Sequence, residues 1–277
     1  MNNKDLTIVI TTYRSEKKIF SCLNSIDKQI KIIVVENSNN SSFKNNLEGK
    51  YKNLNCILMG GNHGYAKSNN AGLSQVKTKY ALVLNPDTII EENAIENFFS
   101  TASKKPDFTL IGPGYDNNNK ESNQQKNILD VKNIKGHAIF INMAKFVNKN
   151  FFDENYFLYF EDIDLCRKVK NENGKIFQDF NIKITHFGAE SVYTGSEFQL
   201  EKNRNWHWMW STFYYHRKNF GYLFALLVII PKFFSAILKL IFHSIILSKK
   251  KTIYLFRIKG IINGVFGKES WYRPSLD

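Results

Sequence analysis

The stretch Leu-Val-Leu-Asn-Pro-Asp-Thr at residues 82–88 decides the fold. It completes a short apolar run, residues 80–84, whose length and composition are typical of a buried parallel strand that the polar Asn-Pro-Asp cannot continue. Asp87 is therefore expected at the carboxyl end of a strand, the edge where open α/β sheets bind ligands. A carboxylate there can hold a divalent cation against a diphosphate. Asn-Pro-Asp also favours a plain β-turn, and only the rest of the chain separates the two interpretations.

Composition places the chain among globular proteins. It has 277 residues, 43% of them hydrophobic, enough for one large α/β domain or a domain with an appendage. Residues 1–5 are polar and lead straight into a strand-like segment, without the basic and apolar regions of a secretion signal. The cysteines Cys22, Cys56 and Cys166 form no CxxC pair, so we expect reduced, buried thiols in a cytosolic protein.

Strand-like and helix-like segments alternate through the first two hundred residues. Strands are expected at residues 6–11, 32–35, 55–59, 80–84 and 108–111, and helices at residues 15–26, 44–51, 65–76 and 91–102. Ser15 is expected to cap the first helix. This alternation predicts crossover connections and a mostly parallel sheet flanked by helices. Because parallel strands share one direction, the polar residues that follow them should converge on one cleft.

Three further segments follow the last of these strands. Residues 116–132, rich in Asn, Gln and Lys, are expected to form a mobile loop. Residues 134–142 return as a strand with Gly136 at its start, where the missing side chain would let an acceptor or a backbone come close. Short strands are expected at 175–177 and 182–185, followed by a loop at 188–195 that could close over a ligand. His186, at the end of the last strand, could ligate the cation expected at Asp87 or contact a phosphate, although a single histidine is more often structural.

Three carboxylates, Glu161, Asp162 and Asp164, follow an aromatic-rich segment at residues 152–160. Acidic residues at a helix start suit the positive end of the helix dipole, which is the simplest explanation of the cluster. Asp164 lies one helical turn before a basic pair, so a surface ion pair is expected for it. Asp162 shares the inward face, where desolvation beside aromatic rings would raise its pKa towards that of a useful general base. Asp162 is therefore the candidate base.

Together these motifs resemble the family-2 glycosyltransferases of the GT-A fold, and within them the rhamnosyltransferase-like branch of cell-surface polysaccharide synthesis. The resemblance covers roughly residues 6–191. Its carriers are Val-Ile-Thr-Thr-Tyr at 9–13, Val-Val-Glu-Asn-Ser at 34–38, Gly-Asn-His-Gly-Tyr-Ala at 61–66 with Asn69 and Asn70, Leu-Asn-Pro-Asp-Thr at 84–88, Gly-His-Ala-Ile-Phe-Ile at 136–141 and Tyr-Phe-Glu-Asp-Ile-Asp-Leu at 159–165. Each motif is weak alone, but their order and spacing are specific.

The resemblance implies a role for each matching residue. Thr11 and Tyr13 would contact the nucleotide, Glu36 with its neighbour Asn37 would lie at a pyrimidine base, Asn62, Gly64 and Asn70 would lie along the ribose and diphosphate, and Asn85 would belong to the same nucleotide-sugar site. Asp87 would be the last acid of the family's Asp-x-Asp motif, which holds Mn²⁺ or Mg²⁺, with His186 near the metal. Asp162 would be the catalytic base and Glu161 its neighbour. Asn85 departs from the motif's first Asp, and Glu36 replaces the commoner Asp.

The implied activity is transfer of a sugar from a nucleotide-diphosphate donor, of the dTDP-rhamnose or UDP-sugar class, to a hydroxyl of a glycan or lipid-linked glycan. A cation would stabilise the charge that develops on the diphosphate. One carboxylate would take the proton of the attacking hydroxyl. With one base and no second nucleophile evident, direct displacement with inversion is the economical hypothesis.

The carboxyl-terminal part, residues 201–277, is expected to form a tail beside a catalytic domain at residues 1–200. Of the net charge of +13, +9 lies in the last 61 residues. The uncharged run before Lys232 is too short to span a bilayer, and a polar stripe (Lys232, Ser235, Lys239 and His243) on an apolar helix favours an amphipathic helix in the membrane interface. A kinked insertion and a soluble oligomer contact are the alternatives. We expect a cytoplasmic protein, peripheral on the inner face of the cell membrane.

The aromatic residues at 206–215 would either pack against the sheet domain or form an interfacial belt. Nucleic-acid binding is disfavoured, because the basic residues flank an aliphatic helix with little that could stack on bases. A nucleotidyltransferase would want a glycine-rich phosphate loop after the first strand, where this chain has Thr-Thr-Tyr-Arg-Ser. A catalytically silent nucleotide-sugar-binding or scaffold subunit of a membrane assembly is the remaining alternative.

Overall fold

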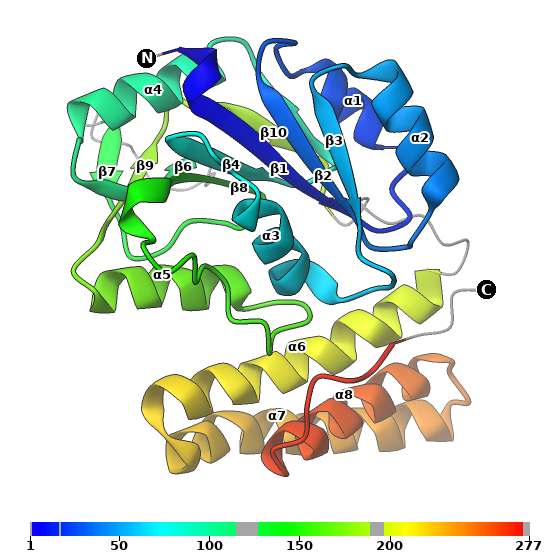
Figure 1. The fold of residues 1–277 in the computed structure, drawn as a ribbon. Coiled ribbons are helices and arrows are strands. Elements are labelled where there is room, and N and C mark those ends of the chain that lie inside the picture. Colours follow the sequence, from blue (N-terminus) through cyan, green and yellow to red (C-terminus); the bar gives the residue numbers. More distant parts are fainter. Residues whose placement is uncertain (1, 17, 115–126, 189–196, 274–277) are drawn as a thin grey trace. The chain divides into compact units, whose positions relative to one another are not determined.

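The computed structural model describes residues 2–16, 18–114, 127–188 and 197–273 (Figure 1). The chain forms two compact units. The first contains Met1–Asp153 and Asp162–Tyr193, and the second contains Glu154–Glu161 and Thr194–Asp277. The short segment Glu154–Glu161 therefore belongs with the carboxyl-terminal helices, although the predicted boundary near residue 200 places it in the catalytic domain.

An eight-stranded sheet in the order β3-β2-β1-β4-β8-β6-β9-β7 forms the centre of the first unit. Its strands are β1 (Leu6–Thr12), β2 (Lys31–Glu36), β3 (Leu54–Leu58), β4 (Tyr80–Leu84), β6 (Phe108–Pro113), β7 (Ile128–Asp130), β8 (Ala138–Asn142) and β9 (Lys175–Asp179). Only β8 and β7 run antiparallel to their neighbours. A separate antiparallel pair joins β5 (Thr88–Ile90) to β10 (Ile184–His186). The expected mostly parallel, GT-A-like sheet is confirmed.

Helices cover both faces of this sheet. They are α1 (Ile19–Asn24), α2 (Ser41–Lys50), α3 (Gly64–Ser74), α4 (Ala94–Lys104) and α5 (Glu161–Asn171), and short 3-10 turns lie at Asn3–Asp5 and Met143–Lys145. Alternate residues of β1, such as Ile8, join a core with side chains of α1, α2 and α4. On the opposite face α3 lies close to the sheet, because a Cβ at Gly72 would be 2.5 Å from Cγ1 of Val9. Burial on both faces explains why the strands are continuous apolar runs.

Several sequence expectations are corrected. Helix α1 begins at Ile19 with Lys18 as its N-cap, so Ser15 is not the N-cap residue, although its backbone carbonyl accepts hydrogen bonds from the amides of Lys18 and Ile19. Part of the expected loop at 116–132 is ordered as β7, since Ile128–Asp130 pairs with β9, while residues 116–126 lie outside the described part of the chain. Most of the predicted ligand-closing loop at 188–195 also lies outside it. Asp164 is only 4% exposed, so the expectation that it lies on the surface is wrong.

Three helices, α6 (Glu197–Phe220), α7 (Tyr222–Ile245) and α8 (Lys250–Val265), lie side by side in the second unit (Figure 1). α6 and α8 pack closely, because a Cβ at Gly260 would lie 2.3 Å from the backbone oxygen of Trp206. Trp210 donates a hydrogen bond from its indole nitrogen to the Lys268 carbonyl at 2.9 Å. The buried aromatic residues of α6 therefore fill a core inside this unit.

His207 ties α6 to the carboxyl-terminal segment. Its Nε2 lies 2.9 Å from the Tyr272 carbonyl and its Nδ1 lies 2.9 Å from the Ser270 hydroxyl. Burial lowers the pKa of His207 to about 3. The imidazole is therefore neutral, with Nε2 donating to the carbonyl and Nδ1 accepting from the hydroxyl.

α7 exposes a broad apolar surface. Its most exposed large side chains are Leu223, Leu227, Leu238 and Ile245, each more than two thirds exposed. Lys239 and His243, members of the predicted polar stripe, lie against Tyr254 of α8, with Nζ 5.7 Å from its ring centroid and the imidazole stacked at 5.2 Å. By length and composition α7 could cross a membrane, the one such helix in the described part of the chain. The argument that the run before Lys232 is too short therefore does not exclude insertion.

Candidate functional site

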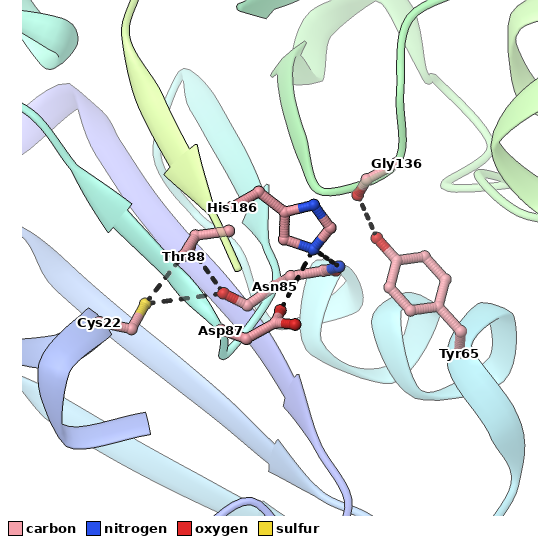
Figure 2. A network of polar contacts seen from close by, with 7 residues as sticks. All are labelled: Cys22, Tyr65, Asn85, Asp87, Thr88, Gly136 and His186. Atoms are coloured by element: carbon pink, nitrogen blue, oxygen red, sulfur yellow. Dashed lines mark hydrogen bonds and ion pairs between the residues drawn. The ribbon is translucent and has the colours of Figure 1, made fainter. Parts of the chain in front are cut away.

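The carboxyl edge of β4 carries the first half of the site. β4 ends at Leu84, where Asn85 and Asp87 turn the chain into β5, and the β5–β10 pairing places His186 opposite Thr88 (Figure 2). Nε2 of His186 lies 3.4 Å from Oδ1 of Asp87 and 3.5 Å from Nδ2 of Asn85. Asp87, Asn85 and His186, which the sequence placed at one metal and diphosphate site, are thus brought together.

Asp87 has the properties of a cation ligand. Its side chain is 1% exposed, and Oδ1 accepts no hydrogen bond from any described residue. A buried carboxylate oxygen without a donor is costly unless something else satisfies it, and a divalent cation is such a partner. The described residues contain no group of three or more His, Cys, Asp or Glu arranged to hold a metal. A cation at Asp87 would therefore draw its other ligands from the substrate, water and His186.

Buried groups under the turn keep its backbone in place. The Thr88 hydroxyl donates to the Asn85 carbonyl at 2.7 Å, and Sγ of Cys22 lies 3.7 Å from both the Asn85 carbonyl and the Thr88 hydroxyl (Figure 2). Burial raises the pKa of Cys22 to about 12, so it stays a thiol. All three cysteines are free and buried, as expected.

Asp162 forms the second half of the site, at the start of α5. Its Oδ2 accepts a 2.8 Å hydrogen bond from the Gly136 amide, and its Oδ1 accepts one of 2.8 Å from the Ile163 amide. Burial raises the pKa of Asp162 above its ordinary value, in the direction that a general base needs. Glu161, the first residue of α5, is buried.

Gly136 is closely approached by a side chain, and not by the acceptor or the backbone that the sequence predicted. A Cβ there would lie 3.0 Å from Oδ2 of Asp162, so the group that comes close is the candidate base. The Gly136 carbonyl accepts a 2.6 Å hydrogen bond from the Tyr65 hydroxyl of α3 (Figure 2). The amide and the carbonyl of Gly136 therefore both help to hold the site. The expected strand at 134–142 begins only at Ala138, so Gly136 lies just before β8.

His137 joins the two halves, and sequence reasoning assigned it no role. Its ring stacks on that of His186, with centroids 4.9 Å apart and planes 7° apart. Its carbonyl accepts a 2.9 Å hydrogen bond from the Asn85 amide. Burial, and next the charge of His186, lower the pKa of His137 to about 4, so it is neutral. Since Gly136 and His137 are consecutive, one short segment contacts both the candidate base and the candidate metal ligand.

The residues predicted to bind the nucleotide lie at the ends of β1 and β2. The Thr11 hydroxyl donates to Oδ1 of Asn69 on α3 at 3.0 Å. Tyr13 is half-buried beneath the Arg14 guanidinium, which lies 5.9 Å from its ring centroid. Glu36 has no exposed surface, and its carboxylate accepts hydrogen bonds from the amides of Ser38 and Asn40. In this structure Glu36 therefore shapes its own loop, and its contact with a base stays a prediction.

Amide side chains position the start of α3 and the loop before α5. Oδ1 of Asn37 accepts hydrogen bonds from the His63 amide and the Ser68 hydroxyl, and Asn62 accepts one from the amide of Gly64, which has a positive φ of 82°. Asn70 exchanges two hydrogen bonds with the backbone of Phe152, at 2.8 and 3.0 Å. These contacts are structural, and direct contacts of these side chains with a ribose or diphosphate stay predictions.

Comparisons with known proteins identify the family of this chain. The family model described as Glycosyl transferase family 2 matches residues 7–167, more than half of the chain. The low-salt glycan biosynthesis hexosyltransferase Agl10 of Haloferax volcanii is 27% identical over 200 residues, which cover 63% of this chain and 64% of that protein. The rhamnosyltransferase WbbL of Escherichia coli K12 is 28% identical over 203 residues, covering 58% of this chain and 75% of that protein. The chain thus spans less than two thirds of the Haloferax protein.

Solved structures show the same fold at low sequence identity. Residues 1–349 of S. aureus TarS align at a TM-score of 0.55 and 15% identity, covering 97% of this chain and 93% of that one. The mannosyltransferase PcManGT of Pyrobaculum calidifontis, solved with GDP-Man and Mn²⁺, aligns at a TM-score of 0.59 and 12% identity, covering 96% and 88%. The parallel sheet, the acid at the end of β4 and the family match over residues 7–167 together lead to one assignment. This chain belongs to glycosyl transferase family 2.

Proposed function

We propose that this protein transfers a sugar from a nucleotide-diphosphate donor, of the dTDP-rhamnose or UDP-sugar class, to a hydroxyl of a glycan or lipid-linked glycan in cell-surface polysaccharide synthesis. The observation that carries the proposal is the buried Oδ1 of Asp87, which has no hydrogen-bond donor among the described residues and lies 3.4 Å from His186. The names of the two curated relatives, a hexosyltransferase in glycan synthesis and a rhamnosyltransferase, support the substrate class.

Asp87 would hold Mn²⁺ or Mg²⁺, with His186 and Asn85 beside it. The donor set fits, because a carboxylate oxygen suits either hard cation and an imidazole is acceptable to Mn²⁺. When bound, the cation would supply positive charge next to the diphosphate leaving group. Thr11, Tyr13 and the residues at the start of α3 are proposed to line the nucleotide, and Glu36 is proposed to turn towards the base.

Asp162 would act as the general base of an inverting displacement. The acceptor oxygen forms a bond to C1 of the sugar, the bond from C1 to the phosphate oxygen breaks, and the hydroxyl proton passes to the Asp162 carboxylate. The amides of Gly136 and Ile163 orient that carboxylate, and its raised pKa makes it a better proton acceptor. Comparison of the anomeric configurations of product and donor by NMR tests this mechanism, and a retained configuration would refute it.

Nucleotide binding tests the proposed activity directly. We expect UDP or dTDP to raise the melting temperature of the detergent-solubilised protein more than GDP or CDP does, because a ligand that binds only the native state stabilises it. Adding Mn²⁺ should enlarge the shift. If none of the four nucleotides changes the melting temperature, the catalytic proposal is wrong and a non-catalytic subunit of a glycan-assembly complex becomes the better description.

The second unit is proposed to attach the enzyme to the inner face of the cell membrane. Helix α7 has an exposed apolar surface, and three lysines follow shortly after its end: Lys249, Lys250 and Lys251. All three lysines are exposed, and they lie at the start of α8. Apolar side chains enter the acyl boundary and basic side chains bind anionic headgroups, so this order suits a bilayer surface.

Vesicle binding tests this attachment. Replacing the three lysines by Gln should lower binding to phosphatidylglycerol-containing vesicles by about a hundredfold, since each Lys near an anionic surface contributes about 1 kcal/mol. Binding to pure phosphatidylcholine vesicles should change little. Gln at Lys28, Lys31 and Lys52, three exposed lysines of the first unit, is the matched control. Equal losses in both triple variants would reject a specific role for residues 249–251.

A further inference from the structure

Four aromatic rings in the second unit form a cluster that the proposed mechanism does not use. Trp208 of α6 lies 5.2 Å from Tyr159 and 5.4 Å from Phe160 between ring centroids, and Phe160 lies 5.4 Å from Tyr215. We call Tyr159, Phe160, Trp208 and Tyr215 the aromatic platform. Two of its rings come from the segment before α5 and two from α6.

Trp208 is the most solvent-exposed member of the aromatic platform. It is 44% exposed, whereas the neighbouring Trp206 and Trp210 on the same helix are 1% and 3% exposed. Tyr159, Phe160 and Tyr215 are half-buried around it. An indole that is kept at the surface while its neighbours are buried offers a flat apolar face to a ligand.

The backbone under the platform is strained. Tyr159 and Phe160 have φ values of 72° and 71°. Residues other than glycine rarely adopt this left-handed backbone conformation, and here two bulky aromatic residues adopt it in succession. The buried Ser211 of α6 donates a 2.9 Å hydrogen bond to the Leu158 carbonyl and helps to hold this geometry. Strain of this kind persists where the surroundings enforce it, and strained residues cluster at active sites, ligand-binding segments and switch regions.

The aromatic platform and the candidate base are close together in the sequence. Only Glu161 separates Phe160 from Asp162. Because consecutive Cα atoms are about 3.8 Å apart, the Cα atoms of Phe160 and Asp162 are separated by no more than about 7.6 Å. A ligand ring on the platform would therefore be bound within a few residues, along the chain, of the candidate base.

We propose that the aromatic platform binds a sugar ring of the acceptor, with Trp208 as its stacking surface. This inference rests on the proposed glycosyl transfer. A pyranose ring has an apolar C–H face that can cover an indole, while its hydroxyl groups remain directed to water. A single exposed ring bordered by half-buried aromatic rings matches one such face. An aliphatic lipid chain would find far more apolar surface along α7.

Fluorine NMR of the intact protein labelled with 5-fluorotryptophan tests this site. The four tryptophans, Trp206, Trp208, Trp210 and Trp271, would each give one resonance, assigned with single Trp→Phe variants. We expect at least one methyl glycoside from a panel of rhamnose, glucose, galactose, mannose and N-acetylglucosamine to shift the Trp208 resonance saturably at tens of millimolar. Glycerol at the same concentrations is the control. The proposal fails if no glycoside shifts Trp208, or if glycerol shifts it equally.

A second measurement separates this proposal from the proposed function. In saturation-transfer difference NMR, which observes the glycoside itself, Trp208→Ala should abolish the glycoside response and leave the UDP and dTDP melting shifts unchanged, while Trp208→Phe should retain part of the response. Trp271→Phe, at a tryptophan that is 59% exposed, is the matched control and should retain all of it. A glycoside response without any nucleotide shift would overturn the transferase activity but not the sugar site, and a nucleotide shift without a glycoside response would overturn the platform alone.

Discussion

Asp162→Asn is expected to slow sugar transfer by about a hundredfold to ten-thousandfold, the range that a positioned general base contributes. Asparagine keeps the size of the side chain, and its single oxygen can still accept one of the two hydrogen bonds that the amides of Gly136 and Ile163 donate to the carboxylate at 2.8 Å. The donor-dependent melting shift should therefore remain. Rates of transfer, measured with radiolabelled donor, check the prediction.

The same substitution should change the stability of the fold in a pH-dependent way. Burial raises the pKa of Asp162 in the folded protein, so the folded state disfavours the ionised carboxylate relative to the unfolded state. Below the unfolded pKa of about 4 the group is protonated in both states and the substitution should have no electrostatic effect. As the pH rises through the pKa of Asp162 in the folded state, the wild-type protein loses stability, whereas the Asp162→Asn variant does not. Melting temperatures of the two proteins from pH 4 to pH 8 should therefore diverge.

Asp130→Asn is the matched control for Asp162. Asp130 lies on β7 and forms a surface ion pair with Lys170 at 2.5 Å, and such exposed pairs contribute little to stability. The transfer rate of the Asp130→Asn variant and the pH dependence of its melting temperature should match those of the wild type. Unchanged turnover of Asp162→Asn would remove Asp162 from the role of base, whatever the stability data show.

Asp87→Asn is expected to remove the Mn²⁺-dependent part of the nucleotide melting shift and to slow transfer by about a hundredfold to a thousandfold. The magnitude is that of losing one electrostatic group that stabilises developing charge. Because Oδ1 of Asp87 accepts no hydrogen bond from the described residues, the substitution should leave no described donor without a partner at that atom. We therefore expect a folded protein whose melting temperature without ligand is at least that of the wild type.

His186→Ala supplies a graded comparison for Asp87. His186 is partly exposed and would contribute a weaker metal contact, so its loss should reduce the Mn²⁺ effect without abolishing it. Isothermal titration of UDP or dTDP, with and without Mn²⁺, measures both variants. An Asp87→Asn protein whose nucleotide affinity still responds fully to Mn²⁺ would contradict the metal role of Asp87.

Much of the fold of the first unit could be predicted from local sequence. Continuous apolar runs such as Tyr80–Leu84 need burial on both faces, and only a sheet covered by helices on both sides provides it. The polar Asn-Pro-Asp that follows then places Asp87 at the ligand-binding edge. These predictions rely on neighbours in the chain, which the sequence displays directly.

Contacts between distant segments could not be predicted in the same way. Helical spacing placed Asp164 on the surface, but it is 4% exposed because its environment is set by other parts of the chain. The role of Glu36 in its own loop also depends on the fold of residues 36–40, where two amides turn towards its carboxylate. Helix α7 shows the same limit, since Lys239 and His243 meet Tyr254 only when α8 packs beside α7.

The sequence by itself indicated the family, through the order and spacing of its motifs. It also placed the strand that precedes Asp87 and the candidate base, each of which is carried by residues adjacent in the chain. Only the tertiary structure decided how these groups are joined. Gly136 contacts Asp162 across 26 positions, and His137 stacks on His186 across nearly twice that distance in sequence. A hydrogen bond of 2.8 Å or a ring stack of 4.9 Å depends on how strands and helices pack, and no local pattern of residues specifies that packing.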